Sequence, residues 1–157
     1  MTTIAWDGYT IAADGMGVWG GTAYCTHKLR LVQRDLRDLW VFGLAGDAPY
    51  CQALFEYWEG LRPEAPVPTP ETGLNALCVD LTTGNCWFAT DTRLVWTRVP
   101  GVFAIGSGAD YALGAMHAGA SALLAIKIAG QLDVNTGTWG QYVSVHVPTM
   151  LNYCEAP

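Results

Sequence analysis

Residues 1–15 read MTTIAWDGYTIAADG and contain two short apolar runs on either side of a turn signal. The first run, 2–6, and the second, 9–13, carry the β-branched and aromatic residues that are typical of strands. Asp7-Gly8 lies between them and favours a tight hairpin turn. Asp14-Gly15 ends the second run. The stretch therefore predicts two antiparallel strands joined by a hairpin.

The next segments continue this pattern of short strands. A glycine-rich stretch with Gly17, Gly20 and Gly21 follows the hairpin. Two further strands are expected at 29–32 and 39–44, separated by the charged turn 34–38.

A change of period at residue 48 predicts a helix. Apolar residues recur at three- and four-residue spacing over 48–61, with Asp47 as N-cap and Pro49 in the first turn. Four prolines between 62 and 71 are incompatible with a helix or a central strand. We expect this segment to be an extended surface connector within one domain that spans 1–157.

The second half is expected to contain a hairpin, one more strand, two helices and a final strand. These elements are predicted at 74–81 with 85–90, at 102–105, within 109–132 on either side of Gly119 and Ser121, and at 141–147, where Pro148 ends the strand. Strands and helices do not alternate regularly, so a layered α+β arrangement of antiparallel sheets fits better than a doubly wound sheet.

Composition excludes several classes of protein. Hydrophobic residues make up 51% of the 157 residues and charged residues 14%, which is too apolar for disorder, yet no run is long enough for a membrane span. A net charge of −6 argues against a nucleic-acid partner. The seven tryptophans are therefore interpreted as core and interface residues. So low a charge density indicates a surface partly buried against other subunits.

The cysteines and histidines do not predict a metal site or a cofactor. Five cysteines are scattered without Cys-x-x-Cys spacing, and His27, His117 and His146 lack the spacing of metal ligands or of a Ser–His triad. The residues after Met1 do not form a signal peptide. We expect reduced cysteines and a cytoplasmic protein.

Thr2 is the candidate nucleophile. Removal of Met1 would place a hydroxyl and a free α-amine on one residue, and the amine, with a reference pKa near 8, could deprotonate the hydroxyl directly or through water.

Five blocks carry a resemblance to a known family. They are Met1–Ile4, Ala12–Gly15, His27–Arg30, Gly43–Asp47 and Ala104–Gly108. In order and spacing the chain resembles the proteasome β-type peptidases, in particular the bacterial HslV peptidase and small phage-encoded relatives. The resemblance implies the N-terminal nucleophile (Ntn) hydrolase fold, a four-layer αββα sandwich. One helical layer would be reduced, because the proline connector stands where the family continues with a second helix.

The resemblance also implies roles for single residues. Thr2 would be the nucleophile, Lys28 the cation that lowers the pKa of the threonine amine and hydroxyl, and Asp14 the acid that holds Lys28. Gly46 would supply the backbone N–H of the oxyanion hole, and Ser107 would lie near the threonine amine.

Three further positions follow from the same resemblance. Asp133 and Thr136 would form a supporting pair, and Ala45 would line an apolar specificity pocket. Simpler interpretations stay open: a turn at Asp14-Gly15, a surface cation at Lys28, a strand-to-helix turn at 106–108, and a helix end at Asp133.

Three functions are therefore considered. The first is a threonine peptidase that acts on peptides or unfolded protein inside a homo-oligomeric ring. The second is a non-catalytic subunit of the same fold that retains Met1. The third is a small-molecule amidase. In the family, the helix that is replaced here helps to build ring contacts. The sequence therefore does not decide whether the chain forms a double ring or has an ATPase unfoldase as partner.

Overall fold

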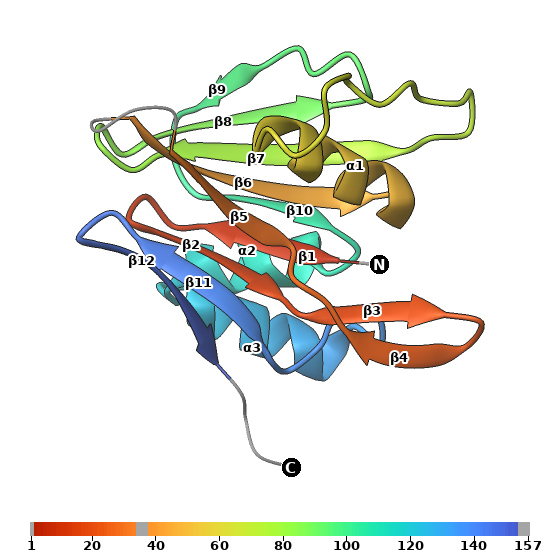
Figure 1. The fold of residues 1–157 in the computed structure, drawn as a ribbon. Helices are drawn as coiled ribbons and strands as arrows, with labels where there is room; N and C mark the ends of the chain where they lie inside the picture. The colour runs from red at the N-terminus through yellow and green to blue at the C-terminus, as the bar shows by residue number, and fades with distance from the viewer. Residues whose placement is uncertain (1, 34–37, 154–157) are drawn as a thin grey trace.

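Two five-stranded antiparallel sheets lie face to face, with helices on their outer faces (Figure 1). This computed structural model describes residues 2–33 and 38–153. The layers follow the order helix, sheet, sheet, helix, because α2 and α3 pack on one sheet and α1 on the other. The predicted α+β class and the four-layer sandwich are both confirmed.

The first sheet is built around the predicted N-terminal hairpin. Its strands, in spatial order, are β10 (Phe103–Gly106), β1 (Thr3–Trp6), β2 (Thr10–Asp14), β11 (Gly140–Ser144) and β12 (Val147–Tyr153). Strands β1 and β2 pair antiparallel, with Ile4 opposite Ala13. Asp7 stabilises the turn by accepting hydrogen bonds from the backbone N–H groups of Tyr9 and Thr10.

The second sheet contains the other predicted strands. In spatial order they are β5 (Leu29–Gln33), β6 (Leu39–Gly46), β7 (Leu74–Asp80), β8 (Asn85–Thr90) and β9 (Thr97–Val99). The short edge strand β9 was not predicted. Most of the expected charged turn, residues 34–37, lies outside the described residues.

The three helices lie in the segments where helices are predicted. Asp47 caps α1 (Ala48–Trp58), since its side chain accepts the Tyr50 N–H at 2.9 Å. The helix ends three residues earlier than predicted, before Gly60 in a positive-φ conformation. The last two helices are α2 (Ala109–His117) and α3 (Ala122–Leu132), with Ser121 capping α3.

One hairpin was not predicted, and one prediction about a strand is wrong. The glycine-rich stretch forms a hairpin of β3 (Met16–Trp19) and β4 (Thr22–Cys25), with the tight turn supplied by Gly20 and Gly21 at positive φ. Pro148 does not end a strand but lies inside β12. It is tolerated there because β12 is an edge strand and its ladder with β11 is irregular at this point.

The main core lies between the two sheets. Its fully buried side chains come from both sheets and include Ile4, Ile11, Leu29, Val41 and Leu77. Among the described residues a single helix, α1, covers the second sheet, and the proline connector follows it (Figure 1). One helical layer is therefore reduced, as expected.

Candidate active site

A buried ion pair joins the two sheets near the N-terminal end of β1. Asp14 ends β2 and Lys28 precedes β5, and Lys28 Nζ donates to Asp14 Oδ1 at 2.8 Å and to Oδ2 at 2.9 Å. The side chains are 7% and 0% exposed. Burial lowers the pKa of the Lys28 ammonium, and the Asp14 carboxylate opposes that shift. The sequence could name both residues but could not show that they touch.

The Asp14 carboxylate also holds the backbone around it. Its Oδ1 accepts the Thr3 N–H at 2.7 Å, and its Oδ2 accepts the N–H groups of Met16 and Gly137, each at 3.0 Å. A carboxylate with this many donors is fully satisfied although it is buried. Asp14 therefore positions Lys28 and the start of β1 together.

The turn after β10 holds the backbone of Thr2. The Ser107 N–H donates to the Thr2 carbonyl at 2.8 Å, and the Ser107 hydroxyl lies 3.5 Å from the same oxygen. Gly106 has φ +97°, and a Cβ there would lie 1.7 Å from the Thr2 carbonyl oxygen. A glycine is thus required at position 106 by both its conformation and its contact. The Ser107 side chain thus contacts Thr2 at the Thr2 carbonyl oxygen.

Asp133 and Thr136 support the neighbouring residue, Thr3. Thr136 Oγ1 donates to Asp133 Oδ2 at 2.7 Å and lies 2.6 Å from Thr3 Oγ1, which also accepts the Gly108 N–H at 3.0 Å. Partial burial raises the pKa of the Asp133 carboxyl, but hydrogen bonds from Thr136, Asn135 and Ser107 outweigh it and leave the pKa lowered. The pair is therefore a partly buried brace under β1.

Thr2, Lys28 and Gly46 line one cleft of about 430 Å³. Its walls also include the β3–β4 hairpin, with Val18 and Tyr24, and the first turns of α1. Thr2 itself is 7% exposed. A reacting carbonyl in this cleft could meet a hydroxyl, a cation and the edge of β6 at once.

Gly46 is a glycine for a structural reason as well. A Cβ at this position would lie 2.0 Å from the Gly73 carbonyl oxygen, because β7 begins directly beside it. The absence of a side chain lets β6 and β7 meet at the edge of the cleft.

The structure does not bring Ala45 to the cleft. Side chains alternate along β6, so Ala45 points between the sheets, is 4% exposed and packs in the main core. The apolar wall is instead formed by Leu44, Cys51 and Phe55. The helical period that predicts α1 places Cys51 and Phe55 on one face of the helix. It does not show that this face lines a cleft. Burial raises the pKa of the Cys51 thiol to about 12.

The rest of the described chain contains no cluster of three or more His, Cys, Asp or Glu residues that could hold a metal ion. None of the helices within 2–33 and 38–153 has the length and hydropathy required to cross a bilayer.

Comparison with known proteins shows similarity in structure only. No protein-family model matches the sequence, and no curated protein matches it either. The solved structure of Anbu (ancestral beta-subunit) from Yersinia bercovieri superposes with a TM-score of 0.76 at 13% identity, covering 99% of this chain and 88% of that one. Thiobacillus denitrificans BPH superposes with a TM-score of 0.65 at 19% identity, over 99% of both chains. The structure of Thiobacillus denitrificans BPH in complex with epoxomicin superposes with a TM-score of 0.64 at 19% identity, covering 98% of this chain and 99% of that one. The chain thus has the fold of these structures, the four-layer Ntn-hydrolase sandwich.

Proposed function

We propose that the protein is a threonine peptidase whose nucleophile is Thr2, exposed as the N-terminal residue once Met1 is removed. Met1 itself lies outside the described residues. The observation that carries the proposal is the buried Asp14–Lys28 pair, whose lysine lines the same cleft as Thr2. A backbone turn alone does not require a buried lysine that is paired with a carboxylate. Beside an N-terminal threonine it supplies a fixed positive charge.

In the first step the Thr2 hydroxyl oxygen attacks the carbonyl carbon of the scissile amide. The hydroxyl proton passes to the α-amine of Thr2, directly or through water. The positive charge of Lys28 favours the alkoxide and lowers the pKa of the amine, so that it is a free base near neutral pH. The Gly46 backbone N–H donates to the oxyanion.

Collapse of the tetrahedral intermediate completes acylation and sets up hydrolysis. The C–N bond breaks, the leaving amine takes the proton from the α-amine, and an ester links the acyl group to Thr2 Oγ1. Water then attacks this ester while the α-amine accepts the proton of the water. Release of the carboxylic acid returns the hydroxyl to Thr2.

The substrate we propose is a peptide or an unfolded protein segment in extended conformation. The cleft is open at the edge of β6, and its apolar wall of Leu44, Cys51 and Phe55 suits an apolar side chain. We further propose a homo-oligomeric ring in the cytoplasm, which would keep folded proteins away from the site. The low charge density of the chain supports the ring. Because the proline connector replaces a helix of the family, the proposal includes neither a second ring nor an unfoldase partner.

Intact-mass spectrometry of the purified protein, with and without epoxomicin, tests the proposal. We expect loss of Met1 and one adduct per chain, because the reagent requires both the hydroxyl and the amine of an N-terminal threonine. Thr2→Ala should lose Met1 and gain no adduct. A protein that retains Met1 and stays unmodified would overturn the peptidase assignment and support the non-catalytic subunit. Turnover of small amides without turnover of peptides would support the amidase.

A further inference from the structure

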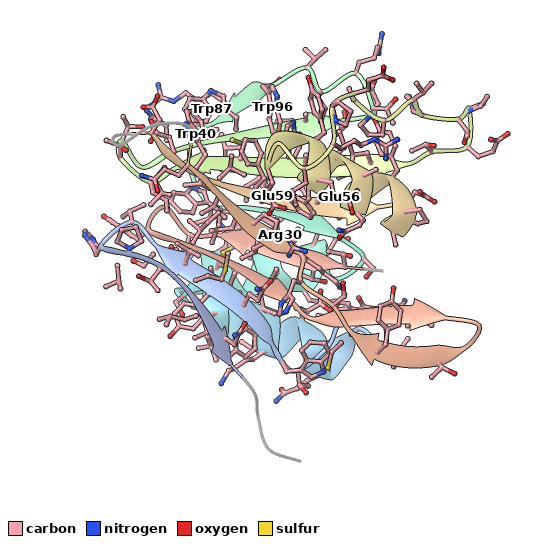
Figure 2. The ribbon with its side chains drawn as sticks, in the orientation of Figure 1. Arg30, Trp40, Glu56, Glu59, Trp87 and Trp96 are labelled. Carbon is pink, nitrogen blue, oxygen red and sulfur yellow. The ribbon has the colours of Figure 1, made fainter. Side chains whose placement is uncertain are left out.

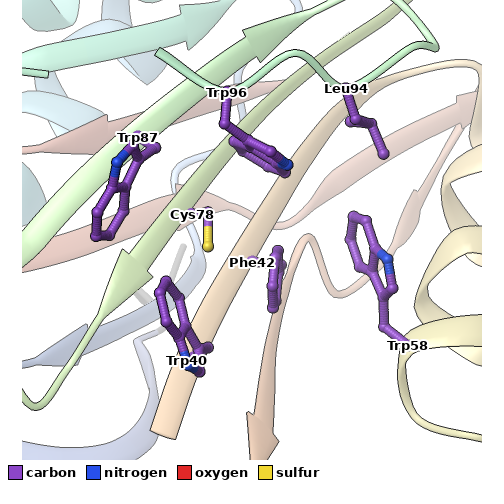
Figure 3. A pocket seen from close by; sticks show the side chains of 7 residues that line it. All are labelled: Trp40, Phe42, Trp58, Cys78, Trp87, Leu94 and Trp96. Carbon is purple, nitrogen blue, oxygen red and sulfur yellow. The ribbon is translucent and has the colours of Figure 1, made fainter. Parts of the chain in front are cut away.

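The outer face of the second sheet carries an aromatic pocket that the proposed chemistry does not use. Four tryptophans, each half-buried, line about 340 Å³ together with three other residues (Figure 3): Trp40, Trp58, Trp87, Trp96, Phe42, Cys78 and Leu94. Trp40, Trp87 and Trp96 lie beyond the end of α1, where Figures 1 and 2 show no helix over the sheet. None of these residues lines the Thr2 cleft.

The pocket is held in shape by contacts between its rings. The Phe42 ring lies 4.5 Å from Trp58 and 6.2 Å from Trp96, and Trp40 lies 5.5 Å from Trp87, as centroid distances. These rings come from β6, α1, β8 and the segment before β9. Because its walls brace one another, the pocket is preformed and loses little conformational entropy on binding.

A cation, Arg98, lies next to the pocket, opposite Trp87 on the neighbouring strand. Phe42, Cys78, Trp87 and Arg98 are opposite one another across β6, β7, β8 and β9, so they share one face of the sheet. Arg98 is exposed and donates to Asn85 Oδ1. Within 2–33 and 38–153 it forms no ion pair. The surface thus combines aromatic faces with a positive charge at its edge.

The proline connector has the complementary chemistry. Residues 62–71 read RPEAPVPTPE and form no helix or strand, and Val67 at their centre is 88% exposed. Proline-rich extended segments dock on aromatic-lined grooves because their backbone is already ordered and its carbonyls are free to accept indole N–H groups. Glu64 and Glu71 flank the centre, and neither forms an ion pair with the described part of the chain.

We propose that the connector of one copy of this chain docks in the tryptophan pocket of a neighbouring copy. The exposed Val67 shows that the connector does not fill the pocket of its own subunit. Pro66-Val67-Pro68 would span about 9 Å as polyproline II. Glu64 or Glu71 would then lie near Arg98. Since the two surfaces differ, the contact is head-to-tail and builds a ring when its rotation closes.

The contact lies apart from the Thr2 cleft and does not depend on the proposed chemistry. Thr2→Ala should assemble as the unchanged protein does, whatever its reaction with epoxomicin. The two proposals therefore fail independently.

Two variants test the contact by analytical ultracentrifugation. The connector variant is Pro66→Ser/Val67→Ser/Pro68→Ser, in an exposed segment, and the pocket variant is Trp96→Ala, with Val95→Ser (68% exposed in the unchanged chain) as its matched control. We expect the unchanged protein and the control to be oligomers. Each of the other two variants should be a folded monomer by circular dichroism.

Mixing the connector and pocket variants gives the sharpest readout. One intact connector and one intact pocket remain between the two chains, so the mixture should form a 1:1 heterodimer and nothing larger. A monomeric unchanged protein, variants that assemble like it, or a mixture that stays monomeric would each overturn the proposal.

A peptide probe measures the same contact directly. The peptide RPEAPVPTPE should shift the tryptophan fluorescence of the connector variant, whose pocket is intact, and Arg98→Glu in that background should weaken binding about five- to tenfold. The control peptide RSEASVSTSE keeps the charges and removes the prolines, and it should not bind. Equal responses to the two peptides, or no response to either, would contradict docking of the connector.

Discussion

Lys28 Nζ contacts both carboxylate oxygens of Asp14, at 2.8 and 2.9 Å, and the same Oδ1 accepts the Thr3 N–H. One buried carboxylate thus ties the start of β1 to the residue that precedes β5. Any movement of Lys28 would move the cation that lines the cleft together with the proposed nucleophile. The pair is both a structural link between the sheets and the electrostatic element of the cleft.

Replacing Lys28 by Met should destabilise the fold and abolish the reaction with epoxomicin. The substitution leaves the Asp14 carboxylate buried without its cation, which typically costs about 3–5 kcal/mol. Urea unfolding measures this loss. Lys28→Met/Asp14→Asn should recover part of the stability, because no buried charge remains, but none of the acylation. Recovery of acylation in the double variant would contradict the role of Lys28.

Gly106→Ala should be far more damaging than Gly119→Ala. Both glycines have nearly the same φ, +97° and +98°, but a Cβ at 106 meets the Thr2 carbonyl whereas a Cβ at 119 meets nothing within 4 Å. The conformational penalty alone is about 1–2 kcal/mol. We expect Gly119→Ala to lose that amount in urea unfolding and still form the adduct. Gly106→Ala should lose more and form none; equal losses would argue against the contact with Thr2.

Thr136→Val should destabilise the protein without changing the residues in the cleft. The substitution keeps the shape but removes the hydroxyl that joins Thr3 to Asp133, and leaving buried acceptors unpaired costs about 1–3 kcal/mol. Thr138→Val, two residues away and exposed, serves as the control and should change stability by no more than about 0.5 kcal/mol. Urea denaturation distinguishes them, and equal stability of the two variants would contradict the brace.

Asp133→Asn should lower thermal stability at neutral pH but not at strongly acidic pH. The pKa of this carboxyl is lower in the folded chain than its ordinary 3.8, so its contribution is present above pH 3.8 and is lost as pH falls through the lower folded value. A difference in Tm of a few degrees at pH 7 should therefore shrink below pH 3.8. A difference that stays constant with pH would point to packing instead of charge.

Alkylation should show whether Thr2 or Cys51 is the nucleophile in the cleft. With its pKa raised to about 12, the Cys51 thiol is ionised at pH 8 in only ~1 molecule in 10,000, and the thiolate is the reactive form. Iodoacetamide at pH 8 should leave Cys51 unmodified and the epoxomicin adduct unchanged, as peptide mapping would show. Rapid modification of Cys51 with loss of the adduct would make the cysteine a rival nucleophile.

Local patterns in the sequence were sufficient for most elements. The β1–β2 hairpin, α1 with its Asp47 cap and the break between α2 and α3 each depend on residues within a few positions of one another. The wrong strand end at Pro148 and the missed hairpin β3–β4 are the two places where the local sequence pattern is not sufficient. Pro148 lies in β12 because that strand is at a sheet edge, and the glycine-rich hairpin β3–β4 has little apolar alternation to reveal it.

By itself the sequence determined the α+β class, because strand period, turns and caps are short-range properties. Its resemblance to the proteasome β-type peptidases indicated the candidate residues Thr2, Asp14 and Lys28. The tertiary structure alone decided which residues meet. Thr3 and Thr136 are 133 positions apart yet hydrogen-bonded, and Ala45 faces the core because the register of β6 turns it inward. Packing of two sheets sets such contacts, and sequence spacing carries no record of the register in which distant strands pair.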